Sequence, residues 1–422
     1  MSATRTWILH PDITSEPGGR APEHALAEAV SLAAALPGVA VAGAEVVRLP
    51  RAHPGTLLGS GKIAALGETL AENDVTLVLI DGPVTPVQQR NLEKAWDLKL
   101  LDRTGLILEI FSDRARTREG VLQVEMAALS YQRTRLVRAW THLERQRGGL
   151  GFVGGPGETQ IEADRRAIDT QLVRLKRQLD KVVKTRALHR AARAKVPFPI
   201  VALVGYTNAG KSTLFNRMTG AEVLAKDMLF ATLDPTMRGV ALPDGREVIL
   251  SDTVGFVSDL PPQLVASFRA TLEEVLAADL ILHVRDIAHP ETDAQADDVE
   301  QILASLGLDR EVPLLEVWNK IDQVADEPRE VLENRAQRHD AVHMISAWTG
   351  EGLPDLLAAV SARLDAPKTE HALHLDFADG RARAWLHEQG VVTSEAQTET
   401  GFELKVLWTA RQAKAFRALT TG

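Results

Sequence analysis

The first 111 residues alternate between short apolar runs and longer amphipathic stretches. Apolar or β-branched runs predict strands at 6–10, 46–49, 75–81 and 98–102. The alanine-rich stretch 23–36 and the segment Pro86–Trp96, which begins with proline, predict helices. Strands and helices in alternation are typical of a parallel sheet covered by helices. The pattern therefore predicts a small N-terminal parallel α/β domain over residues 1–111.

Residues 112–196 change to a heptad pattern, in which apolar positions recur four and three residues apart. The first run comprises Leu122, Met126, Leu129, Leu136, Trp140 and Leu143, with Arg133 in its one gap. The second run comprises Ile161, Ile168, Leu172, Leu175, Leu179 and Val182. Because a glycine-rich loop at 148–157 separates the two runs, they predict an antiparallel helical hairpin. A dimeric coiled coil is the alternative, although each run is short for one.

Two further regions complete the chain. Prolines at 197 and 199 mark the start of the third region, 197–365, whose apolar runs predict strands at 200–204, 238–242, 248–250, 280–284 and 314–317. The last region, 366–422, predicts strands at 372–377 and 402–407 with a helix at 381–389 between them. The predicted fold class is therefore α/β, with a helical hairpin, a large central domain and a small α+β C-terminal domain.

A phosphate-binding motif begins where the first strand of the central region ends. Residues 205–212 match G-x-x-x-x-G-K-[ST], the P-loop. Its glycines let backbone N–H groups approach phosphate oxygens, and the following helix N-terminus adds partial positive charge. Lys211 can reach the β- and γ-phosphates, and the Ser212 hydroxyl can bind Mg²⁺. The strand before the motif and the helix after it favour a nucleotide site over a chance match.

Three more motifs follow the P-loop in a fixed order. D-x-x-G spans Asp252 to Gly255, so that the aspartate can hold Mg²⁺ through water and the glycine N–H can sense the γ-phosphate. In N-K-x-D, Asp322 can accept hydrogen bonds from guanine N1–H and the 2-amino group, a donor pair that adenine lacks. Ser346 and Ala347 then stand where guanine O6 would lie. Four motifs in this order predict a Ras-like P-loop G domain that binds GTP.

The chain contains no cysteine, which excludes several kinds of bond and site. This absence rules out disulfides, Cys-ligated zinc, iron–sulfur clusters and cysteine nucleophiles, and it agrees with a cytoplasmic protein. The N-terminus lacks an apolar run long enough for a signal peptide, and no window approaches 18 apolar residues. We therefore expect a cytoplasmic localisation, with transient association with a membrane left open.

The net charge of −9 conceals a basic segment. Residues 112–195 hold 19 Lys and Arg against 9 Asp and Glu. Such a segment inside an acidic protein favours a polyanionic partner, nucleic acid first, and a solvated helix face is an equal alternative. Arg145, Arg147, Arg165 and Arg166 flank the glycine-rich loop, which is either a functional tip or a flexible connector.

Two features of the N-terminal region invite functional readings that we do not favour. Gly59–Lys62 resembles a second phosphate loop, but Thr56 occupies the first glycine position and Ile63 follows the lysine, so we expect a loop that enters a helix. Asp81 and Asp102 end predicted strands, where the sites of α/β proteins often lie. For each of these aspartates we expect helix capping.

Four stretches of this sequence resemble the HflX family, translation-factor-class GTPases of the Obg–HflX group. They are TREGVLQVEMAALSYQRTRL (117–136), GGPGETQIEADRR (154–166), GYTNAGKSTLFN (205–216), and FATLDPT with DTVGF (230–236 and 252–256). The resemblance covers almost the whole chain. One departure is at Phe152, Val153 and Gly154, where the family's common form has Thr-Arg between two glycines, so a basic residue at the tip is missing.

The resemblance implies a role for each residue of the nucleotide site. Those implied to bind nucleotide are Gly205, Tyr206, Thr207, Asn208, Ala209, Gly210, Lys211, Ser212, Thr213, Phe230, Ala231, Thr232, Asp252, Gly255, Asn319, Lys320, Asp322, Ser346, Ala347 and Trp348. Mg²⁺ is implied at Ser212, Thr232 and, through water, Asp252. Catalysis is implied for Thr232 of switch I, with Thr236 as second candidate, for Gly255 of switch II, and for Lys211.

Phe256 stands directly after D-x-x-G, where Ras-like proteins carry the glutamine that orients water. Because a phenyl ring cannot polarise water, we expect slow intrinsic hydrolysis, with roughly 10⁻⁴ to 10⁻³ s⁻¹ as the reference scale. Help from outside the G domain is then expected, and the ribosome is the candidate. Asn208 matches an asparagine that in related GTPases ligates K⁺, so K⁺ is a candidate cofactor beside GTP/GDP and Mg²⁺.

The resemblance further implies a large-ribosomal-subunit partner, with the hairpin tip near the peptidyl-transferase centre. The expected function is GTP-dependent splitting of stalled or idle ribosomes, often under stress, by a monomer without a DNA partner. The alternatives are a GTP-switched ribosome-assembly or RNA-modification factor, and a non-catalytic, nucleotide-gated scaffold.

Overall fold

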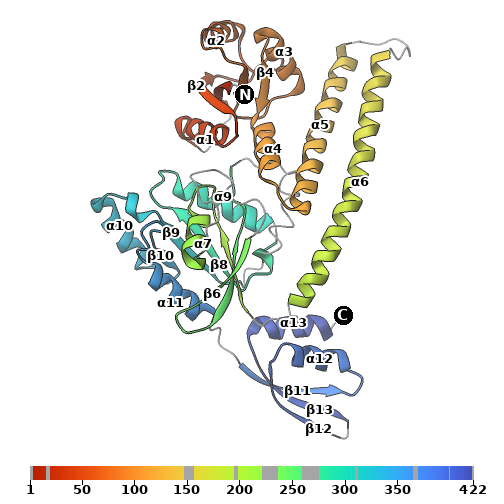
Figure 1. Ribbon diagram of the computed structural model, residues 1–422, viewed down its shortest axis with the longest axis vertical. Helices are drawn as coiled ribbons and strands as arrows, with labels where there is room; N and C mark the ends of the chain where they lie inside the picture. Colours follow the sequence, from red (N-terminus) through yellow and green to blue (C-terminus); the bar gives the residue numbers. More distant parts are fainter. Residues whose placement is uncertain are drawn as a thin grey trace.

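The computed structural model describes residues 3–15, 20–146, 156–193, 198–220, 236–258, 275–305, 307–308, 312–364, 369–398 and 400–420. Figure 1 shows the N-terminal sheet at one end, the G domain in the middle and the C-terminal unit at the other end. The long hairpin runs along one side. Among the described helices, none is long and apolar enough to cross a membrane.

The N-terminal unit is a four-stranded parallel sheet of order β2-β1-β3-β4. Its strands are β1 (Thr4–Ile13), β2 (Val39–Leu49), β3 (Leu77–Ile80) and β4 (Lys99–Asp102), and its helices are α1 (Pro22–Ala34), α2 (Ser60–Glu72), α3 (Pro86–Trp96) and α4 (Arg103–Arg114). β2 begins seven residues before the predicted start. The prediction missed its first half, VAVAGA, because alanine and glycine alternate with its valines and no residue there is fully buried. Gly43, in this half, lies against the Trp7 ring, which a Cβ would strike.

The strand-end aspartates differ in role. Asp102 caps α4, because its carboxylate accepts a hydrogen bond from the Gly105 N–H at 2.8 Å, as predicted. Capping by Asp81 was wrong, since Thr85 caps the next helix, α3. Asp81 instead accepts from Arg103 at 2.6 Å and pairs with His10 at 2.8 Å. The Gly59–Lys62 segment enters α2 as expected, with Gly59 as its N-cap.

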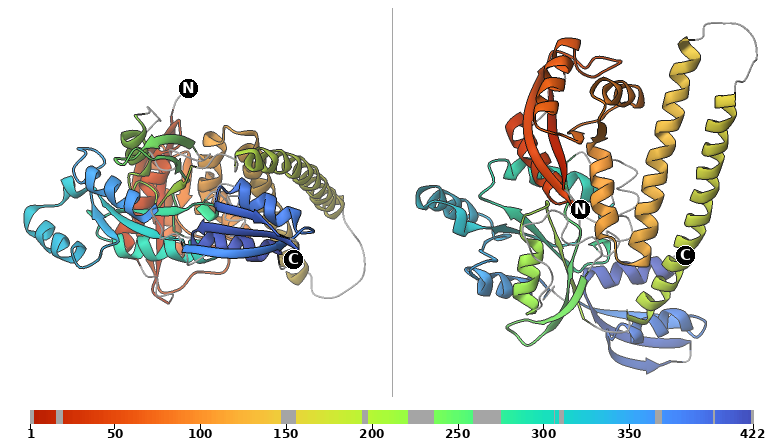
Figure 2. Two further views of the ribbon diagram at one scale, coloured as in Figure 1. Left: turned by 90° about the horizontal axis from the view of Figure 1, so that it is seen from below. Right: turned by 45° about the horizontal axis from the view of Figure 1, so that its top comes forward.

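The hairpin consists of α5 (Arg118–Gln146) and α6 (Pro156–Arg193), which pack against each other and lie side by side in the right view of Figure 2. Leu122 and Leu175 are buried in the predicted seam. Arg133, the polar residue in the heptad pattern, pairs with Asp169 across the helices at 2.8 Å. Val124 and Ala127 pack into a core shared with α4, so the base of the hairpin is fixed to the N-terminal unit.

The G domain is a six-stranded sheet of order β10-β9-β8-β5-β7-β6, in which only the β6–β7 pair is antiparallel. Its strands are β5 (Ile200–Val204), β6 (Thr236–Ala241), β7 (Glu247–Asp252), β8 (Leu280–Asp286), β9 (Leu314–Asn319) and β10 (Val342–Met344). Its described helices are α7 (Lys211–Thr219), α9 (Thr292–Ser305), α10 (Asp326–Ala336) and α11 (Leu353–Leu364), with a short 3₁₀ turn, η1 (Ile321–Gln323). The P-loop, D-x-x-G and N-K-x-D motifs follow β5, β7 and β9, which run parallel in this sheet, and the motifs therefore meet at one edge.

The C-terminal unit is an antiparallel sheet of order β11-β13-β12, formed by β11 (Thr369–Asp376), β12 (Val392–Gln397) and β13 (Gly401–Trp408). Helices α12 (Gly380–Glu388) and α13 (Ala410–Thr420) accompany it. The sequence predicted β11, α12 and β13 but not β12 or α13. β12 lies at a sheet edge with no residue fully buried, so its sequence, VTSEAQ, carries little apolar signal.

One hydrophobic cluster crosses from the N-terminal unit into the G domain. It joins Ile8 and Leu32 of the N-terminal unit with Phe111 of α4, and it continues to Tyr206 of the P-loop and Phe256 after D-x-x-G. All five side chains are at most 4% exposed. The nucleotide motifs therefore share a core with the N-terminal unit.

Candidate nucleotide site

The P-loop is positioned by the buried strand β5, which ends at Val204 and turns through Gly205–Gly210 into α7. Gly205 and Gly210 both have positive φ, at 150° and 91°. A Cβ at Gly205 would collide with the Val284 carbonyl of β8, and one at Gly210 with the Asn319 side chain of β9. Asn208 adopts φ 60°, a left-handed conformation that asparagine tolerates. The turn can therefore lie directly on the strand ends.

Lys211 is held against the first turn of the P-loop. Its Nζ donates to the Gly205 carbonyl at 3.0 Å and to the Tyr206 carbonyl at 2.7 Å. Burial lowers the pKa of Lys211 to about 8, against the opposing effect of Asp252. An anionic phosphate beside this ammonium would favour its charged form.

Two oxygen donors predicted to hold Mg²⁺ lie together. The Ser212 hydroxyl donates to the Asp252 carboxylate at 2.7 Å, and Asp252 is fully buried at the end of β7. A hydroxyl and a carboxylate are the hard oxygen ligands that Mg²⁺ prefers, so this pair fits the ion. Thr232, Phe230 and Ala231 lie outside the described residues, and their roles stay predictions.

The residues after Asp252 pack onto the P-loop. A Cβ on Gly255 would come within 2.9 Å of Thr207 and 3.0 Å of the Lys211 Nζ. Phe256 donates its N–H to the Gly205 carbonyl at 3.1 Å and accepts the Thr207 N–H at 2.6 Å. Its side chain is 1% exposed. The position of the water-orienting glutamine is thus filled by a buried ring whose backbone is pinned to the P-loop.

Asn319 connects the P-loop to the segment predicted to hold the base. Its Nδ2 donates to the Ala209 carbonyl at 2.8 Å, and its Oδ1 accepts the Ala347 N–H at 2.8 Å. Lys320, with φ 67°, donates from Nζ to Asp286 at 2.7 Å. The side chain of Asp322 is exposed, whereas Ser346 is fully buried. The structure therefore brings the predicted P-loop and base residues to one edge of the sheet.

Two contacts at the site were missed by sequence reasoning. Arg217, near the end of α7, donates to the Trp348 carbonyl at 2.5 Å, which fixes the loop whose Trp348 ring is 78% exposed. Tyr206 bonds through its hydroxyl to Glu28 of α1 at 2.7 Å. Neither contact has a spacing signal, because each partner comes from a distant part of the chain.

The chain matches four family models in succession. They are described as GTP-binding GTPase N-terminal (residues 23–112), GTP-binding GTPase Middle Region (114–193), 50S ribosome-binding GTPase (200–320) and HflX C-terminal domain (331–420). A GTPase HflX from Magnetococcus marinus is 50% identical over 86% of this chain and 83% of its own length. The chain belongs to the HflX family of GTPases. The HflX resemblance of its motifs is confirmed, and the protein is a guanine-nucleotide-binding enzyme that hydrolyses GTP.

Other proteins extend the comparison. The GTPase HflX of Escherichia coli is 45% identical over 83% of this HflX chain and 81% of its own. Among solved structures, a GTP-binding protein from the hyperthermophilic archaeon Sulfolobus solfataricus in complex with GDP matches 85% of this chain and 98% of its own. That match has 20% identity and a TM-score of 0.45.

Replacement of Asn319 by alanine should weaken GDP binding by about tenfold to a hundredfold. The change removes two buried hydrogen bonds and leaves the Ala209 carbonyl and the Ala347 N–H without this partner, each worth about 1–3 kcal/mol. Titration of a fluorescent GDP analogue measures the effect. Asn334→Ala is the matched control, since Asn334 is exposed on α10 and, among the described residues, its side chain bonds to the Glu330 carbonyl of its own helix. Equal affinities of the two variants would contradict the role of Asn319.

Proposed function

We propose that this GTPase binds the large ribosomal subunit through its hairpin and uses GTP to split stalled or idle ribosomes. The observation that carries the proposal is the match of residues 200–320 to a family model described as a 50S ribosome-binding GTPase. In this proposal 1–111, 112–196, 197–365 and 366–422 act as four domains. The G domain supplies the GTP-dependent change, and the hairpin supplies the contact with the ribosome.

The nucleotide is proposed to lie across the edge where the motifs meet. The backbone of residues 205–213 would hold the phosphates, with Lys211 beside the β- and γ-phosphates. Ser212 and Asp252 would hold Mg²⁺, which supplies charge neutralisation at the phosphates when bound. Asp322 would accept guanine N1–H and the 2-amino group, and the exposed Trp348 ring would cover the base.

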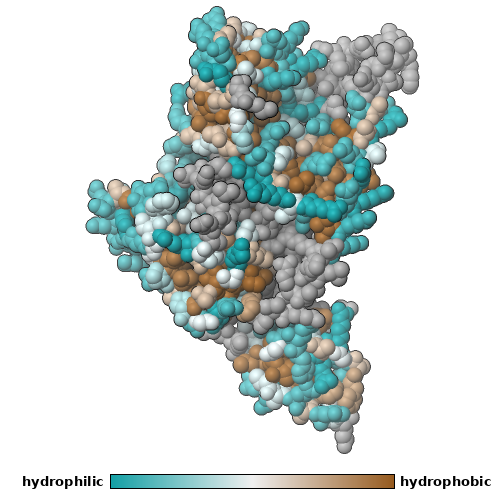
Figure 3. Space-filling view, viewed as in Figure 1, coloured by the Kyte–Doolittle hydropathy of each residue, from teal (hydrophilic) through white to brown (hydrophobic). Residues whose placement is uncertain are grey.

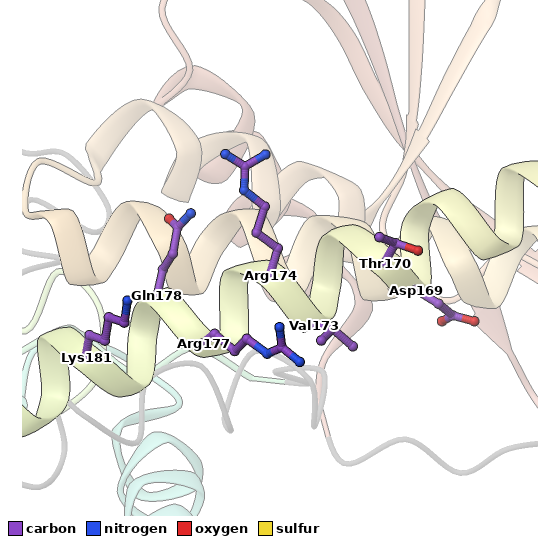
Figure 4. A pocket seen from close by; sticks show the side chains of 7 residues that line it. All are labelled: Asp169, Thr170, Val173, Arg174, Arg177, Gln178 and Lys181. Carbon is purple, nitrogen blue, oxygen red and sulfur yellow. The ribbon is translucent and has the colours of Figure 1, made fainter.

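The hairpin offers a basic surface for ribosomal RNA. Figure 4 shows seven side chains of α6 around one shallow pocket, and Arg174, Arg177 and Lys181 outnumber the single acid, Asp169. Phosphate groups are the sequence-independent partners of such side chains. On the face shown in Figure 3, apolar side chains gather in separate patches rather than in one stripe along the hairpin. The charge of α6 is therefore the better guide to its partner.

Hydrolysis by this G domain alone is proposed to be slow. Phe256 carries no group that can orient water, and its backbone bonds to Gly205 and Thr207 keep the ring in the core. Asn208 offers a carboxamide oxygen on the exposed side of the P-loop, where K⁺ could be ligated. Such an ion would add positive charge where negative charge develops during phosphoryl transfer.

Replacement of Asp322 by asparagine should exchange the base preference from guanine to xanthine. The asparagine amide presents an N–H₂ donor opposite the 2-amino group of guanine, which is also a donor. Xanthine carries a carbonyl acceptor at C2 in place of that amino group. We expect GTP affinity to fall by at least about a hundredfold, because the guanine donors would face a donor instead of the carboxylate, and xanthosine triphosphate hydrolysis to appear. Steady-state turnover of both nucleotides by both proteins is the measurement. Unchanged GTP turnover would remove Asp322 from the base site.

Exchange of K⁺ for Na⁺ should slow GTP hydrolysis by the intact protein. In Asn208→Gly, which keeps the left-handed backbone without strain, the two salts should give equal rates. Phosphate release at constant ionic strength measures both. An equal rate in both salts for the unmodified protein means that K⁺ takes no part.

Large ribosomal subunits should accelerate GTP turnover well above the scale of roughly 10⁻⁴ to 10⁻³ s⁻¹ expected for the protein alone. Sedimentation of 70S ribosomes with the protein and GTP should then show conversion to subunits. Arg174→Glu with Arg177→Glu should weaken both effects, because two attractive contacts become repulsive. Arg381→Glu with Lys405→Glu, exposed in the C-terminal unit, is the matched control. Acceleration without conversion of 70S ribosomes would support an assembly factor instead.

A further inference from the structure

A buried polar cluster joins the N-terminal unit to the nucleotide site. We call Arg20, Glu28, Arg103, Tyr206 and Ser258 the junction cluster. Arg20, Glu28 and Arg103 come from the N-terminal unit, Tyr206 from the P-loop, and Ser258 from the segment three residues after Gly255. Arg103, Tyr206 and Ser258 are 7%, 4% and 8% exposed. Polar groups at such depth hold their geometry strongly, because no water replaces a lost partner.

The junction cluster holds the start of switch II from both sides. From the P-loop, the Tyr206 hydroxyl accepts the Ser258 N–H at 2.8 Å. From the N-terminal unit, the Arg103 Nη2 donates to the Ser258 carbonyl at 3.2 Å and to its hydroxyl at 2.9 Å. The Glu28 carboxylate accepts the Tyr206 hydroxyl at 2.7 Å and the Ser258 hydroxyl at 3.2 Å. Ser258 therefore cannot move without changing contacts on both units.

The charges of the cluster stay paired if Ser258 leaves. Arg103 also donates to Glu28 and to Asp81, at 2.6 Å for the latter. Arg20 donates to Glu28 and Asp298, both at 2.7 Å. Loss of the Ser258 contacts would therefore break hydrogen bonds to an uncharged residue without leaving a buried charge unpaired. An unpaired buried charge is the expensive outcome. Because this outcome is avoided, the contact is one that can open and close.

The neighbour of Arg103 in sequence holds the hairpin. Asp102 accepts the Tyr131 hydroxyl and the Arg135 guanidinium, both from α5. The Arg135 guanidinium also lies 4.4 Å from the centre of the Tyr131 ring. Two consecutive residues at the start of α4 thus contact the hairpin and the start of switch II.

We propose that this junction links the nucleotide to the position of the hairpin. Gly255 is the residue predicted to meet the γ-phosphate, and Ser258 follows it by three positions. A shift of this segment between GDP and GTP would change the hold of Arg103 on Ser258, and the Asp102–Arg103 pair would pass the change to α5. Exchange of GDP for GTP would then change the affinity for a partner that displaces the hairpin. By linkage, that partner would change the ratio of the GTP and GDP affinities by the same factor.

Distance measurement between two spin labels tests this proposal. Because the chain has no cysteine, Val173→Cys on α6 and Glu300→Cys on α9 give a unique pair, and both side chains are exposed. The distance should differ between GDP and a non-hydrolysable GTP analogue. In Tyr206→Phe with Ser258→Ala, which removes two hydroxyls of the junction, this difference should shrink. The ratio of the GDP and analogue affinities should change by at least about fivefold, the lower end of allosteric couplings.

The controls separate coupling from the nucleotide roles on which the proposal rests. Thr69→Ala removes a hydroxyl that bonds to the Ala65 carbonyl within α2, far in sequence from the junction cluster, and should leave the distance change intact. Ser258→Ala alone serves if the double variant does not fold. Loss of GDP binding in the labelled parent would count against the proposed nucleotide site. Intact GDP binding with no nucleotide-dependent distance change, or with a change that survives loss of both hydroxyls, would overturn the coupling.

Discussion

The close packing of the P-loop against β8 and β9 is the constraint from which the rest of the site follows. The Val284 carbonyl and the Asn319 side chain occupy the space that side chains at 205 and 210 would need. With glycine at both positions, the turn approaches these strands closely enough for Asn319 to accept from the Ala347 N–H and donate to the Ala209 carbonyl at the same time. The same close packing lets the Lys211 ammonium donate to the Gly205 and Tyr206 carbonyls. One steric condition thus aligns the two ends of the site that are proposed to bind phosphate and base.

The site is polar at the end proposed to bind phosphate and apolar beside Gly255. The phosphate end is built from backbone groups and from Lys211, Ser212 and Asp252, all held by short hydrogen bonds. The side next to Gly255 is apolar, because Phe256 packs into the core that continues into the N-terminal unit. In our proposal this G domain binds nucleotide with its own residues, but it has no polar side chain at the glutamine position. This is why we propose that its chemistry depends on groups brought from elsewhere.

The fold and the nucleotide motifs could be predicted from the sequence because each signal is local. P-loop, D-x-x-G and N-K-x-D have fixed spacings, and the heptad pattern of the hairpin repeats within each helix. The start of β2 and all of β12 escaped prediction because small or half-exposed residues carry no alternation. The role of Asp81 was misjudged because its partners, His10 and Arg103, lie 71 and 22 residues away. The contacts of Glu28 with Tyr206 and Ser258 were invisible for the same reason, since they form only when two units dock.

The core that joins α1 and α4 to Tyr206 and Phe256 also bears on how such a protein can change over generations. A P-loop domain whose corresponding surface faces solvent can be exchanged between proteins as an independent domain. Here the turn proposed to hold phosphate rests on apolar side chains from another unit, and a fragment starting at residue 197 would leave Tyr206, Val254 and Phe256 facing water. A larger side chain at Ala29 or Ala33 would press on the same cluster. Recombination that separates the two units is therefore disfavoured, and they are expected to be inherited together.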